Sequence, residues 1–332
     1  MLSRIAENIY WMARYLERAE NTARLLDVNY YAMAEAPHGH GGAELVPGQW
    51  RGLLTMTGNE PAFFQHYAEA DETSIVDWLV FRADNASSIR VSLQHARDNA
   101  RSVRYYLNLE MWEAINRAYL ALFVDGEATT ERDQLQQFCA AVRETSHLFF
   151  GIADATLSRD LGWYFMQAGR YLERADNLLR LLTVRFGQGT DSTTADPILD
   201  DQRNRAFLRS IGAYEAFRKR FHASALDPWS MARFLLMDET FPRSVLASAS
   251  ALHAALEAIM RQNPAASYEA ARRAGWYAAQ LRYLPGAEDV IEKGAPSLAD
   301  LLGELSRIAD AVSQTFFVSG RLWTEQQGMQ PQ

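Results

Sequence analysis

The sequence contains one cysteine, Cys139, among its 332 residues. A single thiol excludes an intrachain disulfide and any metal site built from several cysteines, and it is typical of proteins in a reducing compartment. Because the surrounding segment QLQQFCAAV has a helical, apolar pattern, we interpret Cys139 as an inert buried thiol and not as a nucleophile.

Long apolar runs are also missing. The sequence has no charge-free run of eighteen apolar residues, and its first twenty residues, MLSRIAENIYWMARYLERAE, carry charges throughout. This pattern predicts neither a membrane-spanning helix nor a signal peptide, so we expect a cytoplasmic protein without a membrane partner. The net charge of −8 disfavours nucleic acid as a partner.

Motifs for phosphate-cradling loops and for nucleophile elbows are absent, so the sequence predicts no cofactor and no catalytic residue. A metal site is weakly indicated at most. Glu144 and His147 have the spacing of a helical carboxylate–imidazole pair, but the other such pair, Glu35 and His38, has Pro37 between them. We therefore predict no metal site and interpret His147 as a core-facing or capping residue. Whether the protein is an enzyme stays open, and the missing motifs favour a non-catalytic role.

Alternating β-branched runs bounded by turn residues are scarce, whereas helical spacing is abundant. One apolar stripe advances in steps of four and three through Ile5, Ile9, Met12, Leu16, Ala19, Ala23 and Leu26. A second stripe has the same spacing and lies 156 positions later, at Leu161, Phe165, Ala168, Leu172, Ala175, Leu179 and Leu182. Both stripes predict long helices with one buried face, and the fold class is all-α.

The second helix repeats the first in its charged residues as well. RYLERAENTARLL (14–26) returns as RYLERADNLLRLL (170–182), with ten of thirteen positions identical. Weaker matches follow at similar offsets, including GNEPAF (58–63) with GAYEAF (212–217) and WLVF (78–81) with FLLM (234–237). We infer a multi-helix bundle built from two diverged repeats about 156 residues apart, for which a pseudo-twofold arrangement is the simplest expectation.

The expected boundaries follow from clusters of turn residues. Residues 1–127 form the first repeat, 128–158 a connecting helix and 159–322 the second repeat, and 323–332 form a flexible tail. We expect the two repeats to form one compact unit.

A polar stripe lies beside each apolar one. Its members are Arg14, Glu17, Asn21 and Arg24 in the first copy, and Arg170, Glu173, Asn177 and Arg180 in the second. Arg18 and Arg174 lie on a neighbouring row. Ordinary ion pairs on a solvated helix face contribute only about 0.2–0.5 kcal/mol each and tolerate exchange. Of the charged residues in these two stretches only Glu20 changed, to Asp176, so the retained arginines indicate a specific geometry.

Three interpretations of this stripe stay open. The first is a buried network that fixes how the two halves pack. The second is a recognition surface for a carboxylate, a phosphate or an acidic peptide. The third is a catalytic carboxylate, which the neighbouring arginines disfavour because they would lower the pKa of Glu17 and Glu173.

Five blocks in order along the chain carry a resemblance to a bacterial family, the alpha-E domain proteins. They are AENIYWMARYLERAENTARLL, ARDNARSVRYYLNLEMWEAIN, GWYFMQAGRYLERADNLLRLL, FLLMDETFPRSV and LRYLP. The resemblance implies an all-α fold and maps the charged motifs of the family onto Glu17, Arg18, Glu173 and Arg174, with Arg243 in the FPRS block. Position 87 of the first copy is Ser where the second copy has Arg243, so the role of Arg243 is not duplicated.

The resemblance also implies a setting. Alpha-E proteins look like companions of circularly permuted ATP-grasp amide ligases and of transglutaminase-like peptidases. We therefore expect a non-catalytic accessory or scaffold protein that docks on such a ligase or its peptide substrate. The alternative is a binder or enzyme that acts on an acidic small molecule or peptide through an Arg/Glu-lined cavity between the repeats. The oligomeric state is not predicted.

Overall fold

The computed structural model describes residues 1–34, 42–124, 132–186, 197–222, 226–263, 267–291 and 296–318. Within these ranges the chain is helical and contains no strand, so the predicted all-α fold is confirmed. No helix in the described part is long and apolar enough to cross a membrane. The predicted flexible tail, residues 323–332, lies outside the described residues.

The first half of the chain ends with a long helix, α7. In chain order they are α1 (Ser3–Ala34), α2 (Gly42–Thr57), α3 (Glu60–Phe63), α4 (Glu72–Val76), the π-helix η1 (Asp77–Phe81), α5 (Ile89–Ser102), the 3₁₀ turn η2 (Arg104–Tyr106), α6 (Leu109–Phe123) and α7 (Arg132–Thr156).

The second half begins with another long helix, α8. Its helices are α8 (Leu161–Phe186), α9 (Pro197–Ile211), α10 (Tyr214–Phe221), α11 (Pro228–Met237), α12 (Val245–Gln262), α13 (Glu269–Arg282), α14 (Ala287–Ile291), α15 (Leu298–Val312) and the π-helix η3 (Ser313–Val318).

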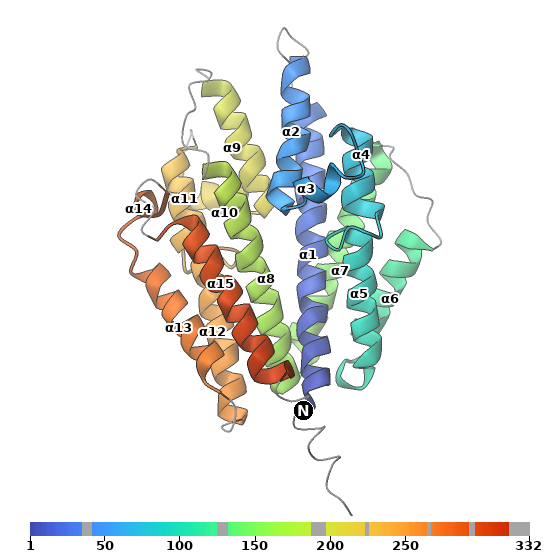
Figure 1. Cartoon of the computed structure of the whole chain (residues 1–332), viewed down its shortest axis with the longest axis vertical. Coiled ribbons are helices and arrows are strands. Elements are labelled where there is room, and N and C mark those ends of the chain that lie inside the picture. Colours follow the sequence, from blue (N-terminus) through green and yellow to red (C-terminus); the bar gives the residue numbers. More distant parts are fainter. Residues whose placement is uncertain are drawn as a thin grey trace, which may run out of the picture.

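Helices α1 and α8 lie side by side at the centre of the bundle and run in the same direction (Figure 1). Their apolar stripes are buried as predicted, except that Ile5 and Leu161, near the helix starts, are half-buried. Helices α5 and α7 pack on α1, and α12 and α15 pack on α8. Both central helices are therefore covered by neighbours, which explains why their sequences carry apolar residues over so many turns.

One glycine sets how closely the two central helices approach. A Cβ added at Gly169 of α8 would overlap the backbone carbonyl oxygen of Tyr10 in α1. Any larger residue at this position would force the helices apart, because backbone atoms cannot move aside as a flexible side chain can.

The turns before α5 and α12 are built alike. Ser88 caps α5 by accepting a hydrogen bond from the Val91 N–H (3.2 Å), and its hydroxyl donates to the Arg82 carbonyl oxygen. Ser244, 156 residues later, caps α12 through the Ala247 N–H (3.0 Å) and donates to the Asp238 carbonyl oxygen. These side-chain bonds fix where each helix begins, and they set the position of the residue that precedes each cap.

Two further expectations concern Cys139 and the connecting helix. Cys139 is fully buried in α7, and burial raises the pKa of its thiol, as expected of an inert cysteine. Helix α7 (Arg132–Thr156) lies inside the range predicted for a connecting helix, 128–158.

Candidate functional site

Two glutamates and four arginines join α1 to α8 at the middle of the bundle. Arg18 binds Glu173 through two hydrogen bonds of 2.6 and 3.1 Å, and Arg174 binds Glu17 through two of 2.7 and 3.0 Å. Such two-pronged contacts use the planar fork of arginine, which lysine cannot reproduce.

The remaining two arginines add one contact each. Arg14 donates to Glu173 over 2.7 Å, and the Nε of Arg170 lies 3.8 Å from a carboxylate oxygen of Glu17. Adding 156 to a residue number in α1 gives the corresponding residue of α8. Under this correspondence the pair Arg14–Glu173 becomes Arg170–Glu17, and the pair Arg18–Glu173 becomes Arg174–Glu17. Each helix therefore supplies the acid for the bases of the other.

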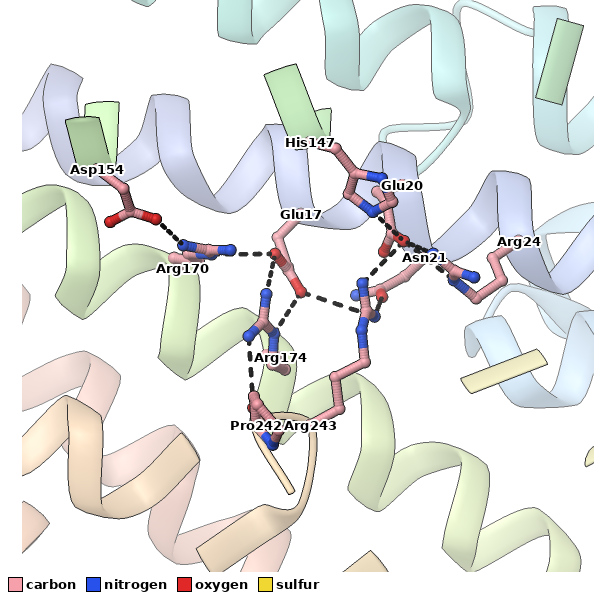
Figure 2. Close-up of polar contacts among 10 residues, drawn as sticks. All are labelled: Glu17, Glu20, Asn21, Arg24, His147, Asp154, Arg170, Arg174, Pro242 and Arg243. Atoms are coloured by element: carbon pink, nitrogen blue, oxygen red, sulfur yellow. Dashed lines mark hydrogen bonds and ion pairs between the residues drawn. The ribbon is translucent and has the colours of Figure 1, made fainter. Parts of the chain in front are cut away.

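A second acid of α1, Glu20, extends this network on one side (Figure 2). Its Oε1 accepts hydrogen bonds from Arg24 (3.0 Å) and Arg243 (2.8 Å), and the Nε2 of His147 lies 3.5 Å away. Arg243 also donates to the amide oxygen of Asn21 over 3.3 Å. We call the group Glu17, Glu20, Asn21, Arg24, His147, Arg170, Arg174 and Arg243 the first polar centre.

Arg243 reaches Glu20 from the turn before α12. Asp238 accepts hydrogen bonds from the N–H groups of Thr240 and Phe241 within that turn, and Arg174 donates to the carbonyl oxygen of Pro242 over 3.4 Å. The turn is thus tied to α8 directly before Arg243. His147 comes from α7, so the first polar centre joins the three helices α1, α7 and α8 to the turn before α12 (Figure 2).

The corresponding residues on the other side form the second polar centre, which consists of Arg14, Arg18, Glu173, Asp176, Asn177 and Arg180. Here Arg180 donates to Asp176 over 2.7 Å, in the way that Arg24 donates to Glu20. Asn177 is half-buried and makes no hydrogen bond within the described part of the chain. The second centre therefore has fewer contacts than the first.

Burial and ion pairing act against each other on the buried acids. Burial raises the pKa of Glu173, but Arg14 and Arg18 outweigh it and hold the pKa at about 2. Burial likewise raises the pKa of Glu20, while Arg243, His147 and Arg24 together hold it well below its usual range. Carboxylates held in the ionised form in this way are poor proton acceptors at neutral pH.

Aromatic rings cover the outer arginines. The guanidinium of Arg14 lies 4.7 Å from the ring centre of Trp11, and that of Arg170 lies 4.0 Å from the ring centre of Phe150 in α7. These stacked contacts keep water from the ion pairs and hold the arginines in place. The arrangement can fix the register of α1 against α8.

The structure brings most of the predicted site residues together. Nine of the eleven take part in ion pairs or hydrogen bonds around Glu17, Glu20 and Glu173: Arg14, Glu17, Arg18, Asn21, Arg24, Arg170, Glu173, Arg174 and Arg243. Arg180 instead pairs with Asp176 at the edge of the second centre, and Asn177 lies beside it without a hydrogen bond in the described part.

Sequence reasoning missed three contributors. Glu20 and Asp176 are both acidic and each lies one turn before an arginine, a signal that the difference between Glu and Asp obscured. Asp154 has a carboxylate 3.8 Å from Arg170, and local spacing did not predict this pair because the two residues lie on different helices.

The interpretation of His147 as a core-facing or capping residue is wrong. Its side chain is more than half exposed, and its ring reaches Glu20 at the surface of the network. Glu144 is also exposed, and the described residues contain no group of three or more His, Cys, Asp or Glu side chains that could hold a metal ion. His147 and Glu144 therefore do not form part of such a group there.

Comparison with known proteins identifies relatives of the chain. The Alpha-E family model, described as a predicted alpha-helical domain with a conserved ER motif, matches residues 1–317. Uncharacterised proteins of Mycobacterium bovis and Mycobacterium tuberculosis are each 27% identical to the chain over 266 residues, or 76% of its length. The match covers 29% of each mycobacterial protein, so the chain spans less than a third of their length. No solved structure matches the chain.

Proposed function

Because the chain belongs to the Alpha-E family, we propose that it is a non-catalytic accessory protein of an ATP-grasp amide-ligase system, which docks on the ligase or on its peptide substrate. The observation that carries this proposal is the closed pairing between α1 and α8. The charged side chains that α1 and α8 share hold the two helices together, so we place function on the outer surface. A ligase partner that consumes ATP would place the protein in the cytoplasm.

The rival function is a cavity that binds or converts an acidic small molecule. It requires Arg14, Glu17, Arg170 and Glu173 to face an opening that solvent can reach. Instead these four side chains are mostly buried and pair with one another across the helices. The geometry therefore favours a structural network over a ligand cavity at this place.

Exposed aromatic side chains on α13 and at its two ends offer a docking surface. Tyr268, Trp276 and Tyr283 are 60%, 70% and 81% exposed, and Arg272 is exposed between Tyr268 and Trp276. Spacings of four and seven residues place them along one side of the helix. Trp, Tyr and Arg are the residues that contribute most often to binding energy at protein interfaces. Such a row of exposed aromatic side chains is expected of a protein that acts by binding another protein.

The length of the mycobacterial relatives gives a second line of support. In each of them the region similar to this chain is joined to a longer remainder of the same polypeptide. Covalent attachment keeps two units at high effective concentration, which is useful when they work together. The joining of a similar region to further sequence in these relatives supports a role beside another protein unit.

The two halves of the bundle are, in this proposal, repeats related by a pseudo-twofold axis that runs between α1 and α8. The reciprocal ion pairs support it, because a twofold axis makes residue i of one unit contact residue j of the other and the reverse. Turn contacts agree: Arg180 lies against Gly58 and Arg24 lies against Gly212, and both glycines have a positive φ.

Helix α7 then closes the first repeat and is not a separate connector. The segment IADA occurs at 152–155 in α7 and at 308–311 in α15, again 156 residues apart. Helix α7 packs on α1, and α15 packs on α8. We therefore propose one repeat from α1 to α7 and another from α8 to α15, in place of the boundary expected at residue 127.

The docking proposal is tested with purified proteins. The chain is mixed at micromolar concentration with an ATP-grasp ligase from the same organism, and the complex is measured by size-exclusion chromatography and by calorimetry. We expect co-elution and a Kd in the micromolar range or below. A chain that elutes separately from the ligase, and from the ligase loaded with ATP and peptide, would contradict the proposal.

Two surface variants locate the interface. Trp276→Ser on α13 is expected to weaken the association at least tenfold, because a central aromatic anchor is lost. Tyr105→Ser is the matched control: its side chain is 95% exposed, and it lies between α5 and α6, on the side of the bundle away from α13 (Figure 1). Equal loss in both variants would show that α13 is not the docking surface.

A further inference from the structure

The first polar centre is completed by two side chains from outside α1 and α8. Arg243 binds Glu20 and Asn21 together, over 2.8 and 3.3 Å, and the His147 ring lies beside the same carboxylate. Glu20 thus has two guanidinium partners and an imidazole, and its side chain is 1% exposed. Glu20 and Asn21 are consecutive residues of α1, and their carboxylate and amide oxygens accept hydrogen bonds from the two terminal nitrogens of the same guanidinium.

The second centre keeps the acid and the amide but lacks both completing side chains. Adding 156 to Glu20 and Asn21 gives Asp176 and Asn177, whereas subtracting 156 from Arg243 gives Ser87, and adding 156 to His147 gives Gly303. Ser87 directly precedes the cap Ser88, as Arg243 directly precedes the cap Ser244. The exchange replaces a long cation and a ring with a hydroxymethyl group and a hydrogen atom.

The contacts of the second centre agree with this loss. Asp176 has one guanidinium partner in the described part, Arg180, and its side chain is 21% exposed. Arg180 is 44% exposed, against 15% for the corresponding Arg24. A Cβ placed on Gly303 would meet no heavy atom within 4 Å outside its own helix backbone and chain neighbours, so no neighbouring element packs directly against this position.

We propose that the second polar centre is a binding site for a cationic side chain, an arginine in preference to a lysine, which a partner peptide or protein inserts over Asp176 and Asn177. Its guanidinium occupies the place that Arg243 occupies in the first centre, with one arm on the Asp176 carboxylate and the other on the Asn177 amide oxygen. Arginine is preferred because its two arms can reach both acceptors at once.

The surrounding charges permit a cation at this place. Arg14 and Arg18 are neutralised in part by Glu173, and Arg180 is bound to Asp176. In the first centre the corresponding Arg170, Arg174 and Arg24 surround Glu17 and Glu20, and that setting accepts Arg243. The inference rests on the repeat correspondence proposed above and does not depend on which protein is the partner.

The test uses the full-length protein and a small probe. Acetyl-Gly-Arg-Gly-amide is titrated into ¹⁵N-labelled protein, and NMR follows the backbone amides of Asn177 and Gly303. Acetyl-Gly-citrulline-Gly-amide, which has the same shape without the charge, is the control. We expect saturable shifts with the arginine peptide and at least tenfold weaker binding of the citrulline peptide, because the ion pair with Asp176 is lost. Equal binding of the two peptides, or none of either, would overturn the proposal.

Three variants assign the site. Asp176→Asn removes the charge and is expected to weaken binding at least tenfold. Ser87→Arg supplies the missing guanidinium from within the chain, so it should block the probe and raise the Tm. Asp201→Asn is the matched control, because Asp201 also binds an arginine one turn later on a helix, and it should bind the probe like the wild type. Circular dichroism checks that each variant is folded.

The outcomes separate this inference from the docking proposal. Unchanged binding by Asp176→Asn, or unchanged binding and Tm in Ser87→Arg, would show that the second centre is not this site. A probe that binds as expected to a chain that does not associate with the ligase would leave the site standing and would remove only the ligase partnership.

Discussion

The two polar centres carry matching residues on α1 and α8 but differ in completeness. The part of each centre that lies between α1 and α8 is nearly the same, whereas the part that faces other helices differs. In the first centre Glu20 is buried under Arg243 and His147; in the second Asp176 is partly exposed beside Arg180. The comparison separates what the helix pair requires from what its surroundings can alter.

Reciprocity explains the shared part. Glu17 binds Arg174 from the other helix, while Arg18 binds Glu173, so each Glu-Arg dipeptide pairs with the opposite helix. A change in either residue leaves a buried charge without its partner, which is costly. Pairs within one exposed helix face can drift, because a solvated charge without a partner costs little.

The largest expected effect comes from removing the shared acids. Glu17→Ala and Glu173→Ala should each lower the free energy of unfolding by about 3–5 kcal/mol, because each leaves buried arginines unpaired. Urea denaturation measures both. Asp201→Ala, which removes a partly exposed acid, is the control and should cost less than about 1 kcal/mol. If one glutamate variant were as mild as the control, the two core pairs would not be equivalent.

Acid should weaken the network through Glu173. The pKa of Glu173 is held at about 2 in the folded protein, against about 4.3 for an ordinary glutamate. A lowered pKa stabilises the fold at pH values above the unfolded-state pKa, and this stabilisation, about 3 kcal/mol, is lost as the pH falls from about 4 to 2. Urea midpoints between neutral pH and pH 2.5 check this. Glu173→Gln should show a shallower loss; an identical slope would place the acid sensitivity elsewhere.

Helix spacing gives the next effect. Gly169→Ala should destabilise the fold by about 2 kcal/mol, because the added Cβ would press on the Tyr10 carbonyl where α1 and α8 meet. The corresponding position in α1 is already alanine, Ala13, which is fully buried. Ala13→Gly is therefore the matched control and should cost only about 1 kcal/mol, as a glycine in a helix interior. Thermal and urea unfolding measure the stability of both variants. Equal destabilisation by the two substitutions would contradict the prediction, because it would indicate that the two positions make equally close contacts between α1 and α8.

The smallest effects concern Arg24 and Arg180, which each pair with an acid of their own helix. Arg24→Ala should cost about 2 kcal/mol, since Arg24 bonds a buried carboxylate, whereas Arg180→Ala should cost less than about 1 kcal/mol, since its pair with Asp176 is partly exposed. Denaturation at low and high salt distinguishes them, because screening weakens exposed pairs more than buried ones. A greater loss of stability in Arg180→Ala than in Arg24→Ala would contradict the prediction that the first centre is the more buried of the two.

Prediction from sequence succeeded where the information is local. Steps of three and four residues were enough to place Leu16, Ala19 and Leu172 in the core, since every turn of a helix repeats the same face. The retained Arg14, Glu17, Arg170 and Glu173 were also recognised as candidates for an inter-repeat network. The burial of Glu20 and the position of His147 escaped prediction, because both depend on helices far away in the sequence.

Residue patterns along the chain are enough to establish that it is helical, which faces are apolar, and that two helices carry the same charged residues. Which acid each arginine binds depends on how the helices pack. Arg18 follows Glu17 directly, yet it binds Glu173, because neighbouring residues of a helix point in different directions while a parallel helix presents its acid at the right level. The packing likewise decided that one centre is closed by Arg243 and His147 and that the other lies partly open beside Gly303.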